Sequence, residues 1–201
     1  MSGIARLRTF VQDMTRLVEQ AAGHEPMLID EGHALLGRLV AADDWLPDVF
    51  AVPDPTSYRQ YLLWCDPLER FSVVSFVWGP GQKTPVHDHT VWGLIGMLRG
   101  TETATAFARD GNRLVANGEE RLTPGLVGAV SPQIGDIHAV SNALADRTSI
   151  SIHVYGANIG AVARHVFDPQ TGAPKPFVSG YSNTLAPNLW DRSAEIRAAL
   201  G

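Results

Sequence analysis

The chain has 201 residues, of which 45% are hydrophobic and only 18% are charged. This composition excludes a disordered chain. Sixteen basic and 21 acidic side chains give a net charge of −5, so we expect no nucleic-acid partner and no membrane partner. The single cysteine, Cys65, excludes an intrachain disulfide and a cysteine-based zinc site. No signal peptide or membrane span is recognisable, which favours a cytoplasmic location. The oligomeric state is left open.

The segment 1–55 contains two runs with helical periodicity and then a connector from Trp45 to Pro55. Apolar side chains recur at three- and four-residue steps over residues 3–21 and again over residues 26–41, with Gly23 and His24 between the two runs. This pattern predicts a helical hairpin in the segment 1–55 that packs on one face of the rest of the chain.

From residue 58 onward, short β-favouring runs alternate with turn residues such as Asp110-Gly111-Asn112 and Asn117-Gly118. Strands are expected at residues 58–64, 71–78, 92–98, 101–108, 113–115, 126–130, 137–141 and 149–155. About eight short strands at this spacing favour a sandwich or barrel, which we assign to residues 56–185. Beyond Phe167 we expect the strands to fade into a proline-rich stretch. Residues 186–201 are expected to form a C-terminal tail with a short helix at 191–200.

Three histidines carry the clearest chemical signal. His87 and His89 are two residues apart, and on a strand they would project from the same face. His138 lies in a predicted strand that a barrel could bring against the first pair. Three imidazoles can hold one divalent metal ion and leave coordination positions open. Imidazole sites bind nickel, manganese and zinc as well as iron, so these histidines alone do not select the metal.

A second pattern alternates polar and β-branched residues. On a strand, Ser151, His153 and Tyr155 would share one face, and Ile152 and Val154 would share the other. Burying three polar groups without partners is costly. The pattern alone therefore favours a solvated polar face and an aliphatic face in the core.

The spacing of glycines and histidines resembles the two sequence motifs of the cupins. The residues that match the first motif are Gly81, His87, His89 and Gly100, and those that match the second are Pro132, Gly135, His138 and Asn142. The second motif has one extra residue between its proline and its glycine. In the first motif Gly93 stands where a glutamate ligand is usual, which leaves three neutral imidazoles and no carboxylate. Such a site can accept an anionic substrate. The resemblance implies a mainly β fold, the cupin double-stranded β-helix or jelly-roll barrel, with an N-terminal helical extension.

The histidine motifs and the Ser-x-His-x-Tyr pattern together resemble the cysteine dioxygenase family of thiol dioxygenases, over about residues 58–181. This resemblance implies iron(II) on His87, His89 and His138. It implies a small thiol carboxylate and O2 as substrates. The thiol would bind as thiolate, and both oxygen atoms would be transferred to sulfur to give a sulfinate.

The same resemblance implies a catalytic relay. The Tyr155 hydroxyl would donate a hydrogen bond toward the reacting groups, His153 would hold the tyrosine, and Ser151 would orient His153.

Three positions are similar to the bacterial branch that contains 3-mercaptopropionate dioxygenase. Gln60 stands where the mammalian type carries a carboxylate-binding arginine, and Gly93 stands where that type carries a cysteine cross-linked to the relay tyrosine. Cys65 lies in another predicted strand, so no such cross-link is expected. Arg164, nine residues after the relay tyrosine, would hold the substrate carboxylate with help from Gln60 or Tyr58. The resemblance thus implies conversion of 3-mercaptopropionate to 3-sulfinopropionate.

Two alternatives stay open. One is a cysteine dioxygenase that converts L-cysteine to cysteine sulfinate. The other is a non-catalytic metal-binding cupin, which would have no need to keep Ser151, His153 and Tyr155 in phase.

Overall fold

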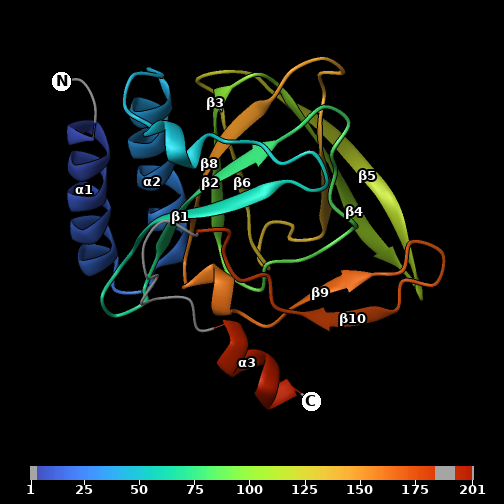
Figure 1. Cartoon of the computed structure of the whole chain (residues 1–201). Coiled ribbons are helices and arrows are strands. Elements are labelled where there is room, and N and C mark those ends of the chain that lie inside the picture. Colours follow the sequence, from blue (N-terminus) through green and yellow to red (C-terminus); the bar gives the residue numbers. More distant parts are fainter. Residues whose placement is uncertain (1–3, 184–192, 201) are drawn as a thin grey trace.

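The two N-terminal helices form the predicted hairpin. The computed structural model describes residues 4–183 and 193–200, and it begins with α1 (Ala5–Ala21) and α2 (Glu25–Val40) packed side by side (Figure 1). Between them, Ala22 and Gly23 take left-handed backbone angles, and the His24 side chain caps α2 by accepting a hydrogen bond from the Met27 N–H. Among the described residues, none of the helices is both long and apolar enough to cross a membrane.

All eight predicted strands are present, and two more follow them. The strands are β1 (Arg59–Cys65), β2 (Ser72–Trp78), β3 (Gly93–Arg99), β4 (Glu102–Asp110), β5 (Arg113–Leu122), β6 (Val127–Val130), β7 (His138–Asn142), β8 (Ser149–Tyr155), β9 (Arg164–Phe167) and β10 (Pro174–Phe177). Short 3₁₀ helices, η1 (Asp48–Phe50) and η2 (Ile159–Ala161), lie before β1 and after β8. The expected C-terminal helix is α3 (Ser193–Leu200). Residues 184–192 and 201 lie outside the described residues, so the predicted start of the tail at residue 186 is not tested.

The strands form a two-layered barrel (Figure 1). One layer is a five-stranded sheet in the order β1-β2-β8-β3-β6. The other contains β5-β4-β7 and the β9-β10 hairpin, and residue His87 joins the two parts by bridging to both His138 in β7 and Val166 in β9. This arrangement confirms the jelly-roll barrel with an N-terminal helical extension.

Two local predictions are wrong. The strands do not fade after Phe167, because β9 and β10 pair antiparallel. Pro174 and Pro176 belong to β10, an outer strand of this hairpin, where a missing N–H is tolerated. The Asn117-Gly118 pair does not end a strand either. It forms a bulge inside β5, since the register with β4 shifts between Thr105 and Phe107.

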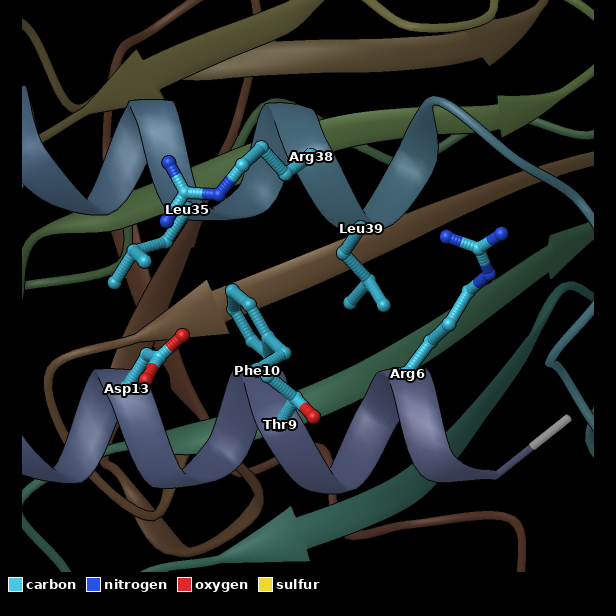
Figure 2. Close-up of a pocket in the computed structure, with 7 residues that line it drawn as sticks. All are labelled: Arg6, Thr9, Phe10, Asp13, Leu35, Arg38 and Leu39. Atoms are coloured by element: carbon cyan, nitrogen blue, oxygen red, sulfur yellow. The ribbon is translucent and has the colours of Figure 1, made fainter. Parts of the chain in front are cut away.

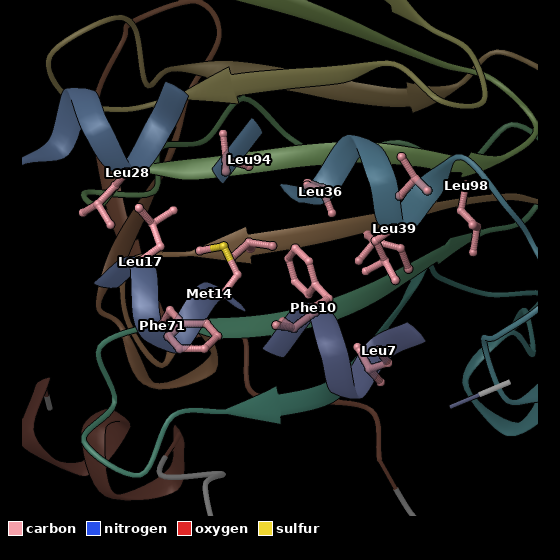
Figure 3. Close-up of a cluster of buried hydrophobic side chains, with 14 of the residues drawn as sticks. Leu7, Phe10, Met14, Leu17, Leu28, Leu36, Leu39, Phe71, Leu94 and Leu98 are labelled. Atoms are coloured by element: carbon pink, nitrogen blue, oxygen red, sulfur yellow. The ribbon is translucent and has the colours of Figure 1, made fainter. Parts of the chain in front are cut away.

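The main hydrophobic core lies between the helices and the outer face of the five-stranded sheet (Figure 3). Helix α2 can approach β3 closely because glycines stand at the contact. A Cβ on Gly96 would lie 2.8 Å from Leu36 Cγ, and a Cβ on Gly32 would lie 2.8 Å from Leu94 Cδ1. The helices therefore seal this face of the sheet and leave the barrel interior to the site.

Candidate metal centre and substrate cavity

The three histidines predicted as metal ligands converge inside the barrel. One possible ligand atom from each of His87, His89 and His138 lies within 4.8 Å of those of the other two. His87 and His138 exchange backbone hydrogen bonds of 2.9 and 3.0 Å, which places their rings side by side. His87 and His89 lie outside the regular strands, since this segment forms only isolated bridges.

Hydrogen bonds at Nδ1 orient two of these imidazoles. His87 Nδ1 lies 3.1 Å from the Pro85 carbonyl oxygen, and His89 Nδ1 lies 2.9 Å from Asp136 Oδ1. Both partners accept, so Nδ1 is the protonated nitrogen in each ring and Nε2 is free to bind a metal ion. Burial holds the pKa of His87 and His89 well below the ordinary value and lowers the pKa of His138 to about 4. Three neutral imidazoles with free ring nitrogens fit a divalent metal ion.

Asp136 fixes the loop that carries His89, and the sequence analysis missed it. Besides the imidazole, its carboxylate accepts hydrogen bonds from the backbone N–H groups of His89 (3.0 Å) and Thr90 (2.8 Å). Thr90 has a left-handed φ of 61°, which is unfavourable for a residue with a side chain. The hydrogen bonds to Asp136 stabilise this conformation. The one available signal was its place two residues before His138, and that signal is weak because Asp is common in turns.

Asp88, between the two histidines in sequence, binds His165. Its carboxylate accepts hydrogen bonds from the backbone N–H (2.7 Å) and the Nδ1 (2.9 Å) of His165.

Ser151, His153 and Tyr155 form a continuous hydrogen-bonded chain on the interior face of β8. Ser151 Oγ lies 2.8 Å from His153 Nε2, and His153 Nδ1 lies 2.7 Å from the Tyr155 hydroxyl. The tyrosine ring stacks on the His89 ring, so the chain ends beside the metal centre. Burial lowers the pKa of His153 to about 3, which keeps this imidazole neutral.

The expectation of a solvated polar face on this strand is therefore wrong. Every residue of β8 is buried. The aliphatic face, including Ile152, packs in the core beneath the helices, and the polar face is satisfied by its own hydrogen bonds.

A cavity of about 160 Å³ lies next to the histidines and the relay. Its lining includes all three residues predicted to bind substrate, Tyr58, Gln60 and Arg164. It also includes His87, His138, His153, Tyr155 and Ser179. No aspartate or glutamate is among its described lining residues.

Arg164 is the cavity's cationic group. It is 3% exposed, its Nη2 donates to Ser179 Oγ at 2.7 Å, and its guanidinium stacks on the Phe177 ring. Its Nε is buried without a hydrogen-bond partner, and within the described chain Arg164 takes part in no salt bridge. A buried cation in this state favours an anionic ligand.

Gln60 and Tyr58 occupy the same cavity by different contacts. Gln60 Nε2 donates to Ser179 Oγ (3.0 Å) and to the Gly180 carbonyl oxygen (2.8 Å), so Ser179 links it to the arginine. The Tyr58 ring stacks on Trp78 with centroids 4.6 Å apart. Sequence analysis missed Ser179 because it lies in the proline-rich region where no structure was expected.

Gly93 places β3 directly against the relay tyrosine. A Cβ there would lie 2.8 Å from Tyr155 Cδ1, so this position is the one from which a side chain would touch the ring. Cys65 is buried in β1, and burial raises the pKa of its thiol to about 12, so it is unreactive. Trp92 belongs to the core beneath the helices, and its indole fills the space that a Cβ on Gly156 would need.

A second cavity of similar size lies between α1 and α2 (Figure 2). Two of its charged groups are paired: Arg6 binds Asp44 and Asp13 binds Arg16. It is separated from the histidines by the five-stranded sheet.

A double-stranded β-helix barrel with three converging histidines defines a metal-binding cupin. Comparison with known proteins narrows this class. The sequence model of the family "Cysteine dioxygenase type I" matches residues 2–168, so the chain belongs to that family. The match includes both N-terminal helices, beyond the range 58–181 that the motifs indicated. The protein is thus a cupin thiol dioxygenase with a three-histidine metal site.

The individual relatives and solved structures that the chain resembles share little sequence identity with it. Cysteine dioxygenase type 1 of Bos taurus is 26% identical over 165 residues and that of Homo sapiens 25%, and each match covers 80% of both chains. A cupin superfamily protein from Desulfitobacterium hafniense has a TM-score of 0.43 at 15% identity, covering 58% of this chain and 93% of its own. A double-stranded β-helix protein from Klebsiella pneumoniae has a TM-score of 0.44 at 16% identity, covering 64% and 91%.

Proposed function

We propose that this protein is an iron(II) enzyme that oxidises small thiol carboxylates to sulfinates, with 3-mercaptopropionate as its preferred substrate. The reaction adds O2 to the thiolate, and both oxygen atoms end on sulfur. Iron(II) held by His87, His89 and His138 would supply the centre at which thiolate and O2 react. The observation that carries the proposal is the buried Arg164, which lines the same cavity as His87 and His138 with no carboxylate among the described lining residues.

Arg164 would position the substrate by its carboxylate. A guanidinium can donate two parallel hydrogen bonds to a carboxylate. The attraction between the two charges is stronger in a buried cavity than in water. Ser179 and Phe177 hold this guanidinium in place before the substrate arrives. Gln60 is already engaged through its amide nitrogen, so its role is to support Ser179 and to fill the place of a second cation. Tyr58 would add its hydroxyl at the same end of the cavity.

The relay would act at the sulfur end. Tyr155 lines the cavity beside His89, where its hydroxyl can donate a hydrogen bond toward the thiolate or toward O2. Its own hydroxyl remains protonated at neutral pH, because burial raises its pKa above the ordinary value. His153 and Ser151 fix the position of this hydroxyl.

The cavity favours 3-mercaptopropionate over L-cysteine by charge. The relatives are named cysteine dioxygenases, but a cysteine ammonium group entering this cavity would find no carboxylate among the described lining residues. It would also lie in the same small cavity as Arg164. Placing a second positive charge there without a partner is unfavourable. Gln60 stands where a second arginine could lie, so Arg164 would be the one cationic side chain among the described lining residues to bind the substrate carboxylate.

The decisive experiment measures oxygen uptake by the iron(II)-loaded protein with 3-mercaptopropionate and with L-cysteine. We expect a higher kcat/KM for 3-mercaptopropionate, with one O2 consumed for each sulfinate formed. A preference for L-cysteine would overturn the substrate assignment and leave the thiol dioxygenase reaction in place. No uptake with any small thiol, at full iron content, would overturn the proposed reaction.

A variant of the arginine tests the role of the carboxylate. Arg164→Met should raise KM for 3-mercaptopropionate much more than it lowers kcat, because about 2–3 kcal/mol of charge-assisted binding is lost. Arg147→Met is the matched control, since Arg147 is exposed and pairs only with its neighbour Asp146. A neutral thiol such as 2-mercaptoethanol should lose nothing on the Arg164 change. Equal losses for the charged and the neutral thiol would contradict the assignment.

A further inference from the structure

Glu102 is a buried carboxylic acid at the inner end of the Ser-His-Tyr relay. It is the first residue of β4 and is 1% exposed. The Ser149 hydroxyl donates to its Oε1 at 3.2 Å, and the Ser151 hydroxyl also faces the carboxyl group. Its Oε2 is buried and makes no hydrogen bond to a described residue. No sequence motif singles out this glutamate, and the proposed mechanism does not use it.

The surroundings of Glu102 favour its neutral form. The polar groups next to its carboxyl group are the hydroxyls of Ser149 and Ser151 on β8. Glu102, Glu120 and His138 line a cavity of about 40 Å³ whose described lining contains no lysine and no arginine. A carboxylate here would have the hydroxyls of Ser149 and Ser151 as partners but no lysine or arginine in the described lining, and a second acidic group shares the cavity. Burial accordingly raises the pKa of Glu102 to about 8.

The protonation of this acid decides which way the relay donates. A serine hydroxyl has one proton and can accept two hydrogen bonds. Trp78 Nε1 already donates to Ser151 Oγ at 3.4 Å. If Glu102 also donates to Ser151 Oγ, the serine proton must point to His153 Nε2. His153 then carries its own proton on Nδ1 and donates it to the Tyr155 oxygen.

In that direction the Tyr155 proton is free to point into the substrate cavity. If Glu102 were ionised, it would instead accept the Ser151 proton. His153 Nε2 would then donate to Ser151, and the Tyr155 hydroxyl would donate to His153 Nδ1. The tyrosine would present only lone pairs to the substrate.

We propose that Glu102 is the fourth member of the relay, a positioning residue that, as a neutral acid, donates to Ser151 and so directs the Tyr155 proton toward the substrate. The consequence for turnover rests on the proposed function. The hydrogen-bond direction and the neutral acid do not, and they can be measured on the metal-free protein.

The first test is infrared spectroscopy of the metal-free protein. The difference spectrum of wild type minus E102Q at pH 7 should show the carbonyl stretch of a protonated carboxylic acid, and this band should disappear as the pH rises above about 8. E120Q is the control, because Glu120 lines the same cavity but is an exposed residue of β5, and it should keep the band. A difference spectrum without a protonated acid at pH 7 would overturn the proposal whatever the enzyme's activity.

The second test is the pH profile of the iron-loaded protein. Glutamine has the shape of a neutral glutamic acid and still donates, so E102Q should lower kcat far less than E102L, which we expect to lower kcat about tenfold at little change in KM. Wild-type kcat should fall on the alkaline side as Glu102 ionises, and E102Q should lack that fall. If E102Q is as impaired as E102L, or keeps the alkaline fall, the proposal is wrong. Should E102L fail to fold, the infrared band and the E102Q profile still decide.

Discussion

The two faces of β8 carry opposite chemistry, although both are buried. Ile150, Ile152 and Val154 pack beneath α1 and α2 in the main hydrophobic core. The alternate residues, Ser151 and His153 among them, face the barrel interior and are hydrogen-bonded to one another. A strand of a simple half-exposed sheet would give one of these faces to water.

This difference shows how the fold makes room for a polar interior. Burial of apolar side chains supplies most of the stability of a domain, at about 25 cal/mol for each Å² removed from water. In this protein the helices provide much of that burial outside the barrel (Figure 3). The interior can therefore hold histidines, an arginine and a neutral acid. Each of the following substitutions tests whether the apolar core under the helices and the polar barrel interior act independently.

The largest effect is expected from His138→Ala, which breaks the polar interior at the metal centre. Removing one of three imidazoles should abolish metal binding and with it all measurable oxygen uptake, while the far-ultraviolet circular dichroism stays that of a folded barrel. His165→Gln is the control, because His165 pairs with Asp88 outside the metal centre. Retention of stoichiometric iron by His138→Ala would contradict the ligand assignment.

The next largest effect is expected on the opposite face. Ile152→Ala removes a fully buried side chain from the helix-covered core and should lower the free energy of unfolding by about 3 kcal/mol in urea titrations. The kcat per folded molecule should be nearly unchanged. Ser151→Ala, on the adjacent residue, should instead lower kcat through the relay. If Ile152→Ala impaired catalysis as much as Ser151→Ala, the two faces would not be independent.

A smaller effect is expected from Asp136→Asn. The neutral amide holds His89 less firmly, so iron affinity should fall about 10- to 100-fold in a competition titration with a chelator. Asp88→Asn is a closely matched control: Asp88 also accepts from the backbone N–H and the Nδ1 of one histidine, but that histidine, His165, is not a ligand. Equal losses in the two variants would mean that Asp136 acts on the fold rather than on the metal.

The sequence predicted the elements of the fold better than their surroundings. Local sequence patterns found both N-terminal helices and eight of the ten described strands. They could not show that β8 is covered on both sides, since that depends on where the helices pack. They also missed the β9-β10 pair. Proline is unusual in strands, but Pro174 and Pro176 are tolerated in β10 because an outer strand does not use every backbone N–H in pairing.

The candidate site followed the same rule. His87 and His89, and the three relay residues, recur at two-residue spacings, and the family resemblance added His138 and the relay. The structure brings these residues together as expected. Asp136, Ser179 and Glu102 have no such spacing. Their importance arises only from contacts with residues distant in the chain, such as the hydrogen bond from Arg164 to Ser179.

The smallest predicted effect is the acid sensitivity that a neutral, buried imidazole imposes on the fold. Burial lowers the pKa of His153 to about 3 from its ordinary 6.5, so below pH 6.5 the unfolded chain binds a proton that the folded chain excludes. Stability must therefore fall as the pH drops from 6.5 toward 3, by about 1.4 kcal/mol per pH unit for this one group.

Glutamine in place of His153 can occupy the same position without titrating. In urea titrations of the metal-free protein at pH 7, 6 and 5, the loss of unfolding free energy for His153→Gln should be shallower than for wild type by about that slope. Parallel curves for the two proteins would mean that His153 is protonated inside the barrel, and the relay could not then be a chain of neutral groups.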